Sequence, residues 1–220
     1  SCATDGTEAW AWMSLPLLAA DGCSVVFNSD SDLLVPDDTN NEFDIFKRTL
    51  LGICDRDLDG VSEAVEVGAP NGGDGNNDGV PDSQQANVDS LPNSGDGEYV
   101  TLAAPPDTDL TDVAALDNPA PGTEPAATEF PAGFLRFNVS GLTPGAVFTV
   151  EVFLEGGVTA ETYYKYGPTP DNPTNHWYEF GYDGTTGAEI LSDKIVLHFV
   201  DGGRGDGEQS GNEAGISEAQ

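Results

Sequence analysis

Two acidic segments near the middle of the chain have the residue types and spacing of calcium-binding loops. The first, residues 55–66, carries oxygen-bearing side chains at positions 1, 3, 5, 9 and 12, with Gly60 at position 6. In such a loop alternate carboxylates converge on one cation, the carbonyl at position 7 adds an oxygen, and a final Glu binds through both of its oxygens. The predicted ligands of this first loop are Asp55, Asp57, Asp59, Val61, Glu63 and Glu66.

The second loop, residues 74–85, repeats the pattern through position 9, again with a glycine, Gly79, at position 6. It ends in Gln85, which offers one neutral oxygen where a Glu would offer two charged ones. One Asp-rich turn alone is also compatible with a solvated surface loop, but two in register favour calcium. The predicted ligands of the second loop are Asp74, Asn76, Asp78, Val80, Asp82 and Gln85.

The surroundings of the loops do not indicate a calcium sensor, whose loops lie between two helices that move on binding. The loops start 19 residues apart, and a strand-like run precedes the first. Between them only residues 64–67 could form a helical turn before Gly68 and Pro70 stop it. We therefore expect the ions to stiffen a connector, residues 54–92, that has few apolar residues of its own.

Charge limits the partners and the location of the protein. The 220 residues include 39 Asp and Glu against 7 Lys and Arg, a net charge of -32. So anionic a surface would repel nucleic acid and anionic lipid, and no apolar run approaches the ~20 residues of a membrane span. Calcium at extracellular concentrations fills sites with Kd near ~10⁻⁴–10⁻³ M. We predict an extracellular, cell-surface protein without membrane insertion.

Cysteines give a second indication of the compartment. Cys2, Cys23 and Cys54 are an odd set, which in an oxidising compartment predicts one disulfide and one leftover cysteine. Three free or buried thiols are the alternative. Cys54 directly precedes the first loop, where a disulfide would anchor the connector.

Hydrophobic periodicity predicts an all-β fold. Alternating runs separated by Gly/Pro turns occur at 98–103, 111–116, 133–139, 147–154, 162–166, 176–182 and 194–200. About seven such strands predict an antiparallel, jelly-roll-like β-sandwich. The predicted organisation is a β segment at 1–53, the calcium connector at 54–92, the sandwich at 93–206 and a polar tail at 207–220.

The N-terminal segment contains a candidate assembly strand. Residues 8–14 place Trp10 and Trp12 on one face, and the segment has too few further strands to pair all of its own backbone groups. We expect this strand to add to a neighbouring molecule, either in a homopolymer or on another surface protein. Pairing with residues 23–28 of its own chain is the alternative.

Several long motifs resemble a known family. The runs YYKYGPTPDNPT (163–174), HWYEF (176–180), YDGTTGA (182–188) and HFVDGGRGD (198–206) resemble the choice-of-anchor U domain of bacterial surface proteins, over residues 69–206. The loops at 55–85 resemble the thrombospondin type 3 or dockerin-like calcium repeats that often precede this domain. Residues 20–46 are similar to one incomplete blade of a bacterial β-propeller. The resemblance implies a non-enzymatic domain at the cell surface.

Catalytic patterns are weak. His176 and His198, the only histidines, lie in alternating strands, and no nucleophile motif or phosphate-binding glycine loop occurs. We therefore expect no enzyme, but a calcium-binding structural subunit of a surface filament or assembly. The alternative is a stalk, or an adhesion module whose aromatic residues at 163–166 and 177–178 stack on a glycan. The RGD triplet at 204–206 lies inside the family-like motif, which argues against integrin binding.

Overall fold

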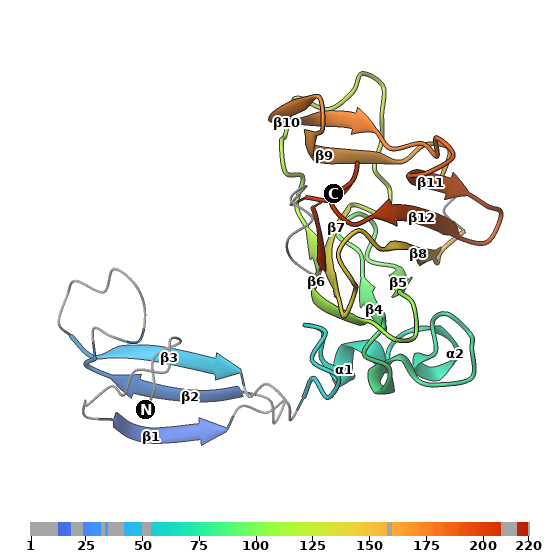
Figure 1. Ribbon diagram of the computed structural model, residues 1–220. Coiled ribbons are helices and arrows are strands. Elements are labelled where there is room, and N and C mark those ends of the chain that lie inside the picture. The colour runs from blue at the N-terminus through green and yellow to red at the C-terminus, as the bar shows by residue number, and fades with distance from the viewer. Residues whose placement is uncertain are drawn as a thin grey trace. The chain divides into compact units, whose positions relative to one another are not determined.

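The computed structural model describes residues 13–18, 24–31, 34, 42–49, 54–157, 160–207 and 215–219. The chain divides into two compact units, Ser1–Cys54 and Asp55–Gln220 (Figure 1). In the first unit, strands β1 (Met13–Leu18), β2 (Ser24–Ser29) and β3 (Asp44–Thr49) form an antiparallel sheet in the order β1-β2-β3. Phe27 and Phe46 are partners across β2 and β3, and their rings stack with centroids 5.6 Å apart.

The structure describes only the last part of the candidate assembly strand. Strand β1 runs from Met13 to Leu18, and Met13 and Ser14 pair with Ser29 and Asn28 of the same chain, the kind of pairing named above as the alternative; residues 8–12 lie outside the described residues. Pro16 interrupts the alternation beyond Ser14, yet it is tolerated because β1 lies at the sheet edge and its register shifts between Ser14 and Leu17. Trp10 and Trp12 lie outside the described residues.

A five-stranded antiparallel sheet forms one layer of the second unit, in the order β11-β12-β8-β5-β4. Alternate residues of β8 and β12, such as Val150 and Leu197, are fully buried. The strands are β4 (Val88–Pro92), β5 (Tyr99–Ala103), β8 (Val147–Leu154), β11 (Gly187–Ile190) and β12 (Ile195–Val200).

The opposing layer is a three-stranded sheet in the order β13-β7-β6, with β6 (Asp109–Leu116), β7 (Phe134–Ser140) and β13 (Gly215–Ala219). Leu110 and Phe137 from this sheet share one buried core with Leu102 and Val150 from the five-stranded sheet. A hairpin of β9 (Tyr164–Thr169) and β10 (Asn172–Glu179) completes the unit. The predicted all-β, sandwich-like fold is confirmed, with 42% strand and 6% helix.

Three strands were not recognised in the sequence. β4 lies within residues 54–92, β11 has only four residues, and β13 lies in the polar tail. Their sequences, VDSLP, GAEI and GISEA, lack a sustained apolar alternation, so their order depends on pairing with β5, β12 and β7. The seven strands predicted between residues 98 and 200 occur, six of them with bounds shifted by a few residues.

Short helical turns fill the stretch before β4 (Figure 1). These are α1 (Glu63–Glu66), α2 (Pro70–Gly73) and the 3₁₀ turn η1 (Asp82–Gln84). Gly68 and Pro70 follow α1, as the sequence indicates. Within the described residues, no helix has the length and apolar character needed to cross a membrane.

Candidate metal centre

The first loop has the backbone that its spacing predicts. Leu58 and Gly60, at positions 4 and 6, both have positive φ, of 67° and 112°. The turn brings the Gly60 N–H to 3.2 Å from Oδ2 of Asp55 and the Val61 N–H to 2.8 Å from Oδ1 of Asp59. These bonds fix the orientation of the two carboxylates and leave Oδ1 of Asp55 and Oδ2 of Asp59 without a donor among the described residues.

The sandwich holds this loop in place. The Val61 side chain is part of the buried core, and the Val113 N–H of β6 donates to the carbonyl of Asp59 at 3.1 Å. The Tyr99 hydroxyl of β5 donates to the carbonyl of Val65 at 2.6 Å. The first loop is therefore packed against the domain, a connection that its polar sequence did not indicate.

Five carboxylates converge at this loop, in two groups that share one member. The groups are Asp55, Asp57 and Asp59, and Asp59, Glu66 and Asp89. Within each group, one oxygen of every carboxylate lies within 4.8 Å of the others. We call the five residues the carboxylate cluster.

Most of the oxygens in the carboxylate cluster are buried without a donor. No group of the described residues donates a hydrogen bond to Oδ1 of Asp55, Oδ2 of Asp59, or either oxygen of Asp57, Glu66 and Asp89. Nor does a described Lys or Arg form an ion pair with any of the five. Because a buried unpaired carboxylate is strongly unfavourable, the cluster needs a cation or protons to be stable.

The pKa values show how unfavourable the charge is. Burial raises the pKa of Glu66 from its ordinary 4.5 to about 9, with further contributions from the charges of Asp59 and Asp57. Burial also raises the pKa of Asp59 to about 7 and that of Asp89 well above its ordinary range. Five acids that repel one another this strongly could hold a divalent cation, whose charge would offset the repulsion.

One member of the cluster was missed in the sequence, and one predicted ligand is absent from it. Asp89 lies on β4, outside both loops, and is fully buried. An Asp between Val88 and Ser90 carries no loop spacing, so only the fold reveals it. Glu63, at position 9, begins α1 and belongs to neither carboxylate group.

The second loop repeats the backbone but not the burial. Asn77 and Gly79, at positions 4 and 6, again have positive φ, of 58° and 94°. Asp74 accepts the Asp78 and Gly79 N–H groups at 3.0 and 2.9 Å, and Asp78 accepts the Val80 N–H at 2.9 Å. The loop's own amides therefore satisfy these oxygens, and Asp78, Gly79 and Val80 are exposed.

Asp82 and Gln85 are the predicted ligands at positions 9 and 12 of the second loop. The Gln85 amide lies 3.4 Å from Oδ1 of Asp78 and 3.3 Å from the carbonyl of Val80, so positions 5, 7 and 12 do meet. Asp82 is fully buried, and its Oδ2 accepts the Gly75 N–H and the Ser90 hydroxyl at 2.9 and 2.6 Å. Its Oδ1 has no donor among the described residues.

Strand β4 connects the two loops to the sandwich through adjacent residues. Side chains alternate between the two faces of a strand, so Asp89 and Ser90 point in opposite directions. Asp89 joins the carboxylate cluster, whereas Ser90 contacts Asp82 of the second loop and lies 2.6 Å from Thr101 Oγ1 of β5.

The described cysteine and the two histidines make contacts within the fold. Cys54 is disulfide-bonded, and Cys2 and Cys23 lie outside the described residues. His198 stacks on Tyr182 with ring centroids 4.2 Å apart, and Nδ1 of His176 lies 2.8 Å from the carbonyl of Thr174.

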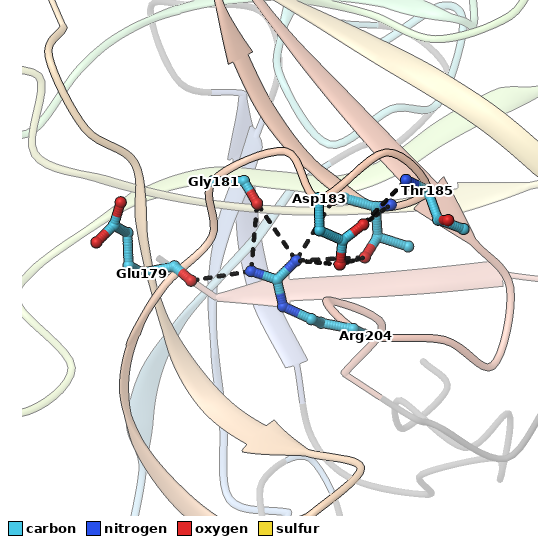
Figure 2. A network of polar contacts seen from close by, with 6 residues as sticks. Glu179, Gly181, Asp183, Thr185 and Arg204 are labelled. Atoms are coloured by element: carbon cyan, nitrogen blue, oxygen red, sulfur yellow. Dashed lines mark hydrogen bonds and ion pairs between the residues drawn. The ribbon is translucent and has the colours of Figure 1, made fainter.

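The RGD triplet is part of the packing at the end of β12. Arg204 donates to the carbonyls of Glu179 and Gly181 at 3.0 and 3.3 Å and pairs with Asp183 at 3.1 Å (Figure 2). Asp206 is buried and accepts the Gly202 N–H at 2.7 Å. Both charged side chains of the triplet are therefore engaged within the fold.

Comparisons of the chain with family models, curated proteins and solved structures found no match. The resemblances to choice-of-anchor, calcium-repeat and propeller sequences remain predictions. The functional assignment is therefore argued from the site itself.

Proposed function

We propose that this chain is a calcium-binding structural module of an extracellular surface assembly, and not an enzyme. The observation that carries the proposal is the carboxylate cluster. Its five acidic residues lie together, largely buried, with eight oxygens that no described group satisfies. A bound cation resolves this arrangement, and the fold then depends on the ion.

The ligand chemistry favours calcium over other cations. Ca²⁺ takes six to eight oxygens and tolerates irregular geometry, whereas Mg²⁺ keeps several waters and one or two carboxylates. Neither carboxylate group contains the His or Cys ligands typical of zinc. The carbonyl of Val61, in the position-7 role, adds a further oxygen at the first loop.

Two observations support an extracellular location. Cys54 is disulfide-bonded, and disulfides persist in oxidising compartments. The net charge of -32 also suits a medium in which salt and calcium screen the repulsion among acidic groups. Calcium would then be continuously available, which fits a structural rather than a signalling role.

The first unit supports a role in assembly. Leu17, Leu18 and Ile45 of its small sheet are 67%, 63% and 80% exposed, and Phe43, just before β3, is 56% exposed. A three-stranded sheet with exposed apolar residues, whose edge strands β1 and β3 have no further partner among the described residues, is a surface on which a neighbouring copy can dock. Head-to-tail docking of this kind produces filaments unless the rotation closes a ring.

Thermal unfolding with and without calcium tests the central proposal. The full chain should melt at a clearly higher temperature in millimolar calcium chloride than in excess chelator. Magnesium chloride at equal ionic strength is the control and should recover little of the difference. Identical melting in calcium and chelator would refute the proposal.

Point variants test the assembly role. Ile45→Asp should reduce self-association, measured by light scattering and negative-stain microscopy in calcium, without changing the melting temperature. Val147→Asp is the matched control, because Val147 is 74% exposed at the start of β8, in the second unit. A wild-type chain that stays monomeric at high concentration in calcium would remove this part of the proposal.

A glycan-binding adhesion module is the second candidate, and a cavity favours it. The cavity, of about 620 Å³, opens among β7, β8 and the start of β9, and Phe130, Tyr163 and Tyr164 line it. Its volume suits a small ligand, and aromatic walls can stack on sugar rings. Binding on a glycan array that Tyr164→Ala abolishes would favour this candidate over a purely structural module.

A further inference from the structure

We infer that the carboxylate cluster holds two divalent cations bridged by Asp59, and that Asp89 of β4 binds the second. The inference rests on the proposed calcium function and changes its content. The loop spacing predicts one ion for residues 55–66, whereas the structure assigns two ions and makes a sandwich strand part of the site.

The carboxylates of the cluster are spaced for two ions rather than one. Oxygen ligands lie ~2.3–2.6 Å from calcium, so two ligands on opposite sides of one ion are at most about 5 Å apart. The five carboxylates do not form one group within 4.8 Å, but two groups of three that share Asp59. Each group has the dimensions of a single coordination shell, and a shared carboxylate is the natural bridge between two shells.

Asp89 has the surroundings of a ligand rather than of a packing residue. Its side chain is fully buried on a strand, and neither of its oxygens accepts a hydrogen bond from a described residue. A buried Asp kept for packing alone would be expected to accept hydrogen bonds, as Asp82 does from Gly75 and Ser90. Asp89 instead points at Asp59 and Glu66, the residues of the second group.

The charge of the cluster also favours two ions over one. Five ionised carboxylates carry a formal charge of -5. One divalent cation leaves -3 in a largely buried site, and two leave -1. Because each uncompensated buried charge is strongly destabilising, the doubly occupied cluster is the better balanced state.

The second ion would tie the first loop to the sandwich. Asp89 is directly opposite Leu102 in the β4–β5 pairing, and Leu91, two residues further along β4, is in the core. An ion held by Asp59, Glu66 and Asp89 therefore joins the loop, α1 and the sheet edge at one point.

Counting bound ions tests the inference. The second loop is first disabled by Asp74→Asn and Asp78→Asn in the full chain, so that the remaining tight sites belong to the cluster. Calcium chloride titration by calorimetry, with elemental analysis after gel filtration, should then find two ions per chain. One ion would overturn the inference while leaving the proposed function intact, and none would refute both.

A single substitution then assigns the second ion. Asp89→Asn in this background should reduce the count from two ions to one, whereas Asp109→Asn, an exposed Asp on β6, should leave two. In chelator Asp89→Asn should melt above its parent, because a neutral Asn can be buried there without the cost of burying a carboxylate, and in calcium it should melt below. An unchanged count would overturn the role of Asp89. If Asp89→Asn does not fold, the count in the parent still decides between one ion and two.

Discussion

The two loops have nearly the same ligand spacing and the same backbone turn. Their carboxylates differ, however, in how much they need a cation to compensate their charge. In the first loop the carboxylates are buried in contact with the sandwich, and most of their oxygens have no donor among the described residues. In the second loop the residues around Asp78 are exposed and its own N–H groups bond to the carboxylates. Spacing therefore defines which oxygens can meet, and burial determines whether they need an ion.

The effect of burial is visible in the pKa values of the two loops. Burial raises the pKa of Glu66 to about 9. At Asp78 slight burial works in the same direction, but bonds from the Val80 N–H and the side chains of Asn76 and Gln85 outweigh it, and the pKa falls below its ordinary value. An ion at the first loop would relieve strong repulsion among buried carboxylates, whereas an ion at the second loop would compete with existing hydrogen bonds.

Calcium removal should produce the largest difference between the loops. An ion present at 100 times its Kd stabilises a protein by ~2.7 kcal/mol, so we expect chelation to cost about this amount at the cluster when calcium is that far above its Kd. Hydrogen exchange should show strong deprotection of residues 55–66 and of β4, and a small change at residues 75–80. Deprotection confined to the second loop would reverse the comparison.

Substitution of the last ligand of each loop, at position 12, should have a larger effect in the first loop than in the second. Glu66→Gln keeps the shape of the side chain but removes its charge, and we expect calcium affinity at the first loop to fall at least tenfold, or ~1.4 kcal/mol. Gln85→Ala should change calcium affinity at the second loop less, because the lost group is neutral. Calorimetric titration of both variants measures the two effects, and a larger loss from Gln85→Ala would contradict this ranking.

The pH dependence of the metal-free protein is the third test. The folded pKa of Glu66, about 9, lies above its ordinary 4.5, so the folded state binds more protons between these values. The free energy of unfolding in chelator is therefore highest below about pH 4.5 for this group and falls as the pH rises toward 9. Denaturant unfolding across this range checks the slope.

Calcium should oppose that trend, because protons and calcium compete for the same oxygens. The stabilisation by calcium, measured as the difference between paired unfolding curves, should grow with pH. In the Glu66→Gln variant the fall in chelator should be shallower. A metal-free protein whose stability rises between pH 5 and 9 would show that the cluster carboxylates are not held in a desolvated site.

The sequence was a good guide to local structure and a poor one to context. The spacing of the first loop predicts that Asp55, Asp57, Asp59 and Glu66 surround one ion. In the structure Asp55, Asp57 and Asp59 form one group, whereas Glu66 joins Asp59 in the other, and ion binding itself stays a prediction. Alternation likewise predicted β8 and β12, whose buried residues are strictly every second one.

Contacts between distant segments were not predictable from spacing. Asp89 follows Glu66 by a stretch that includes the whole second loop, and only the pairing of β4 with β5 brings it to the cluster. The same holds for β13, a polar segment that is a strand because β7 offers it a free edge. Residues 15–18 were left out of the predicted N-terminal strand because Pro16 normally ends a strand, and the place of β1 at a sheet edge removes that penalty.

The smallest expected effect comes from converting the second loop toward the first. Gln85→Glu replaces one neutral oxygen by a charged carboxylate with two oxygens, next to Asp78 and the Val80 carbonyl, where the Gln85 amide already lies. We expect calcium affinity at the second loop to rise severalfold, or ~1 kcal/mol, but not to reach that of the first loop, because the site stays solvated and screened. Gln84→Glu, an exposed neighbour in η1, is the control for added charge alone. Calorimetric titration in a Glu66→Gln, Asp89→Asn background would isolate the second loop. If Gln85→Glu there reached the affinity of the unaltered first loop, ligand identity rather than burial would account for the difference between the two loops.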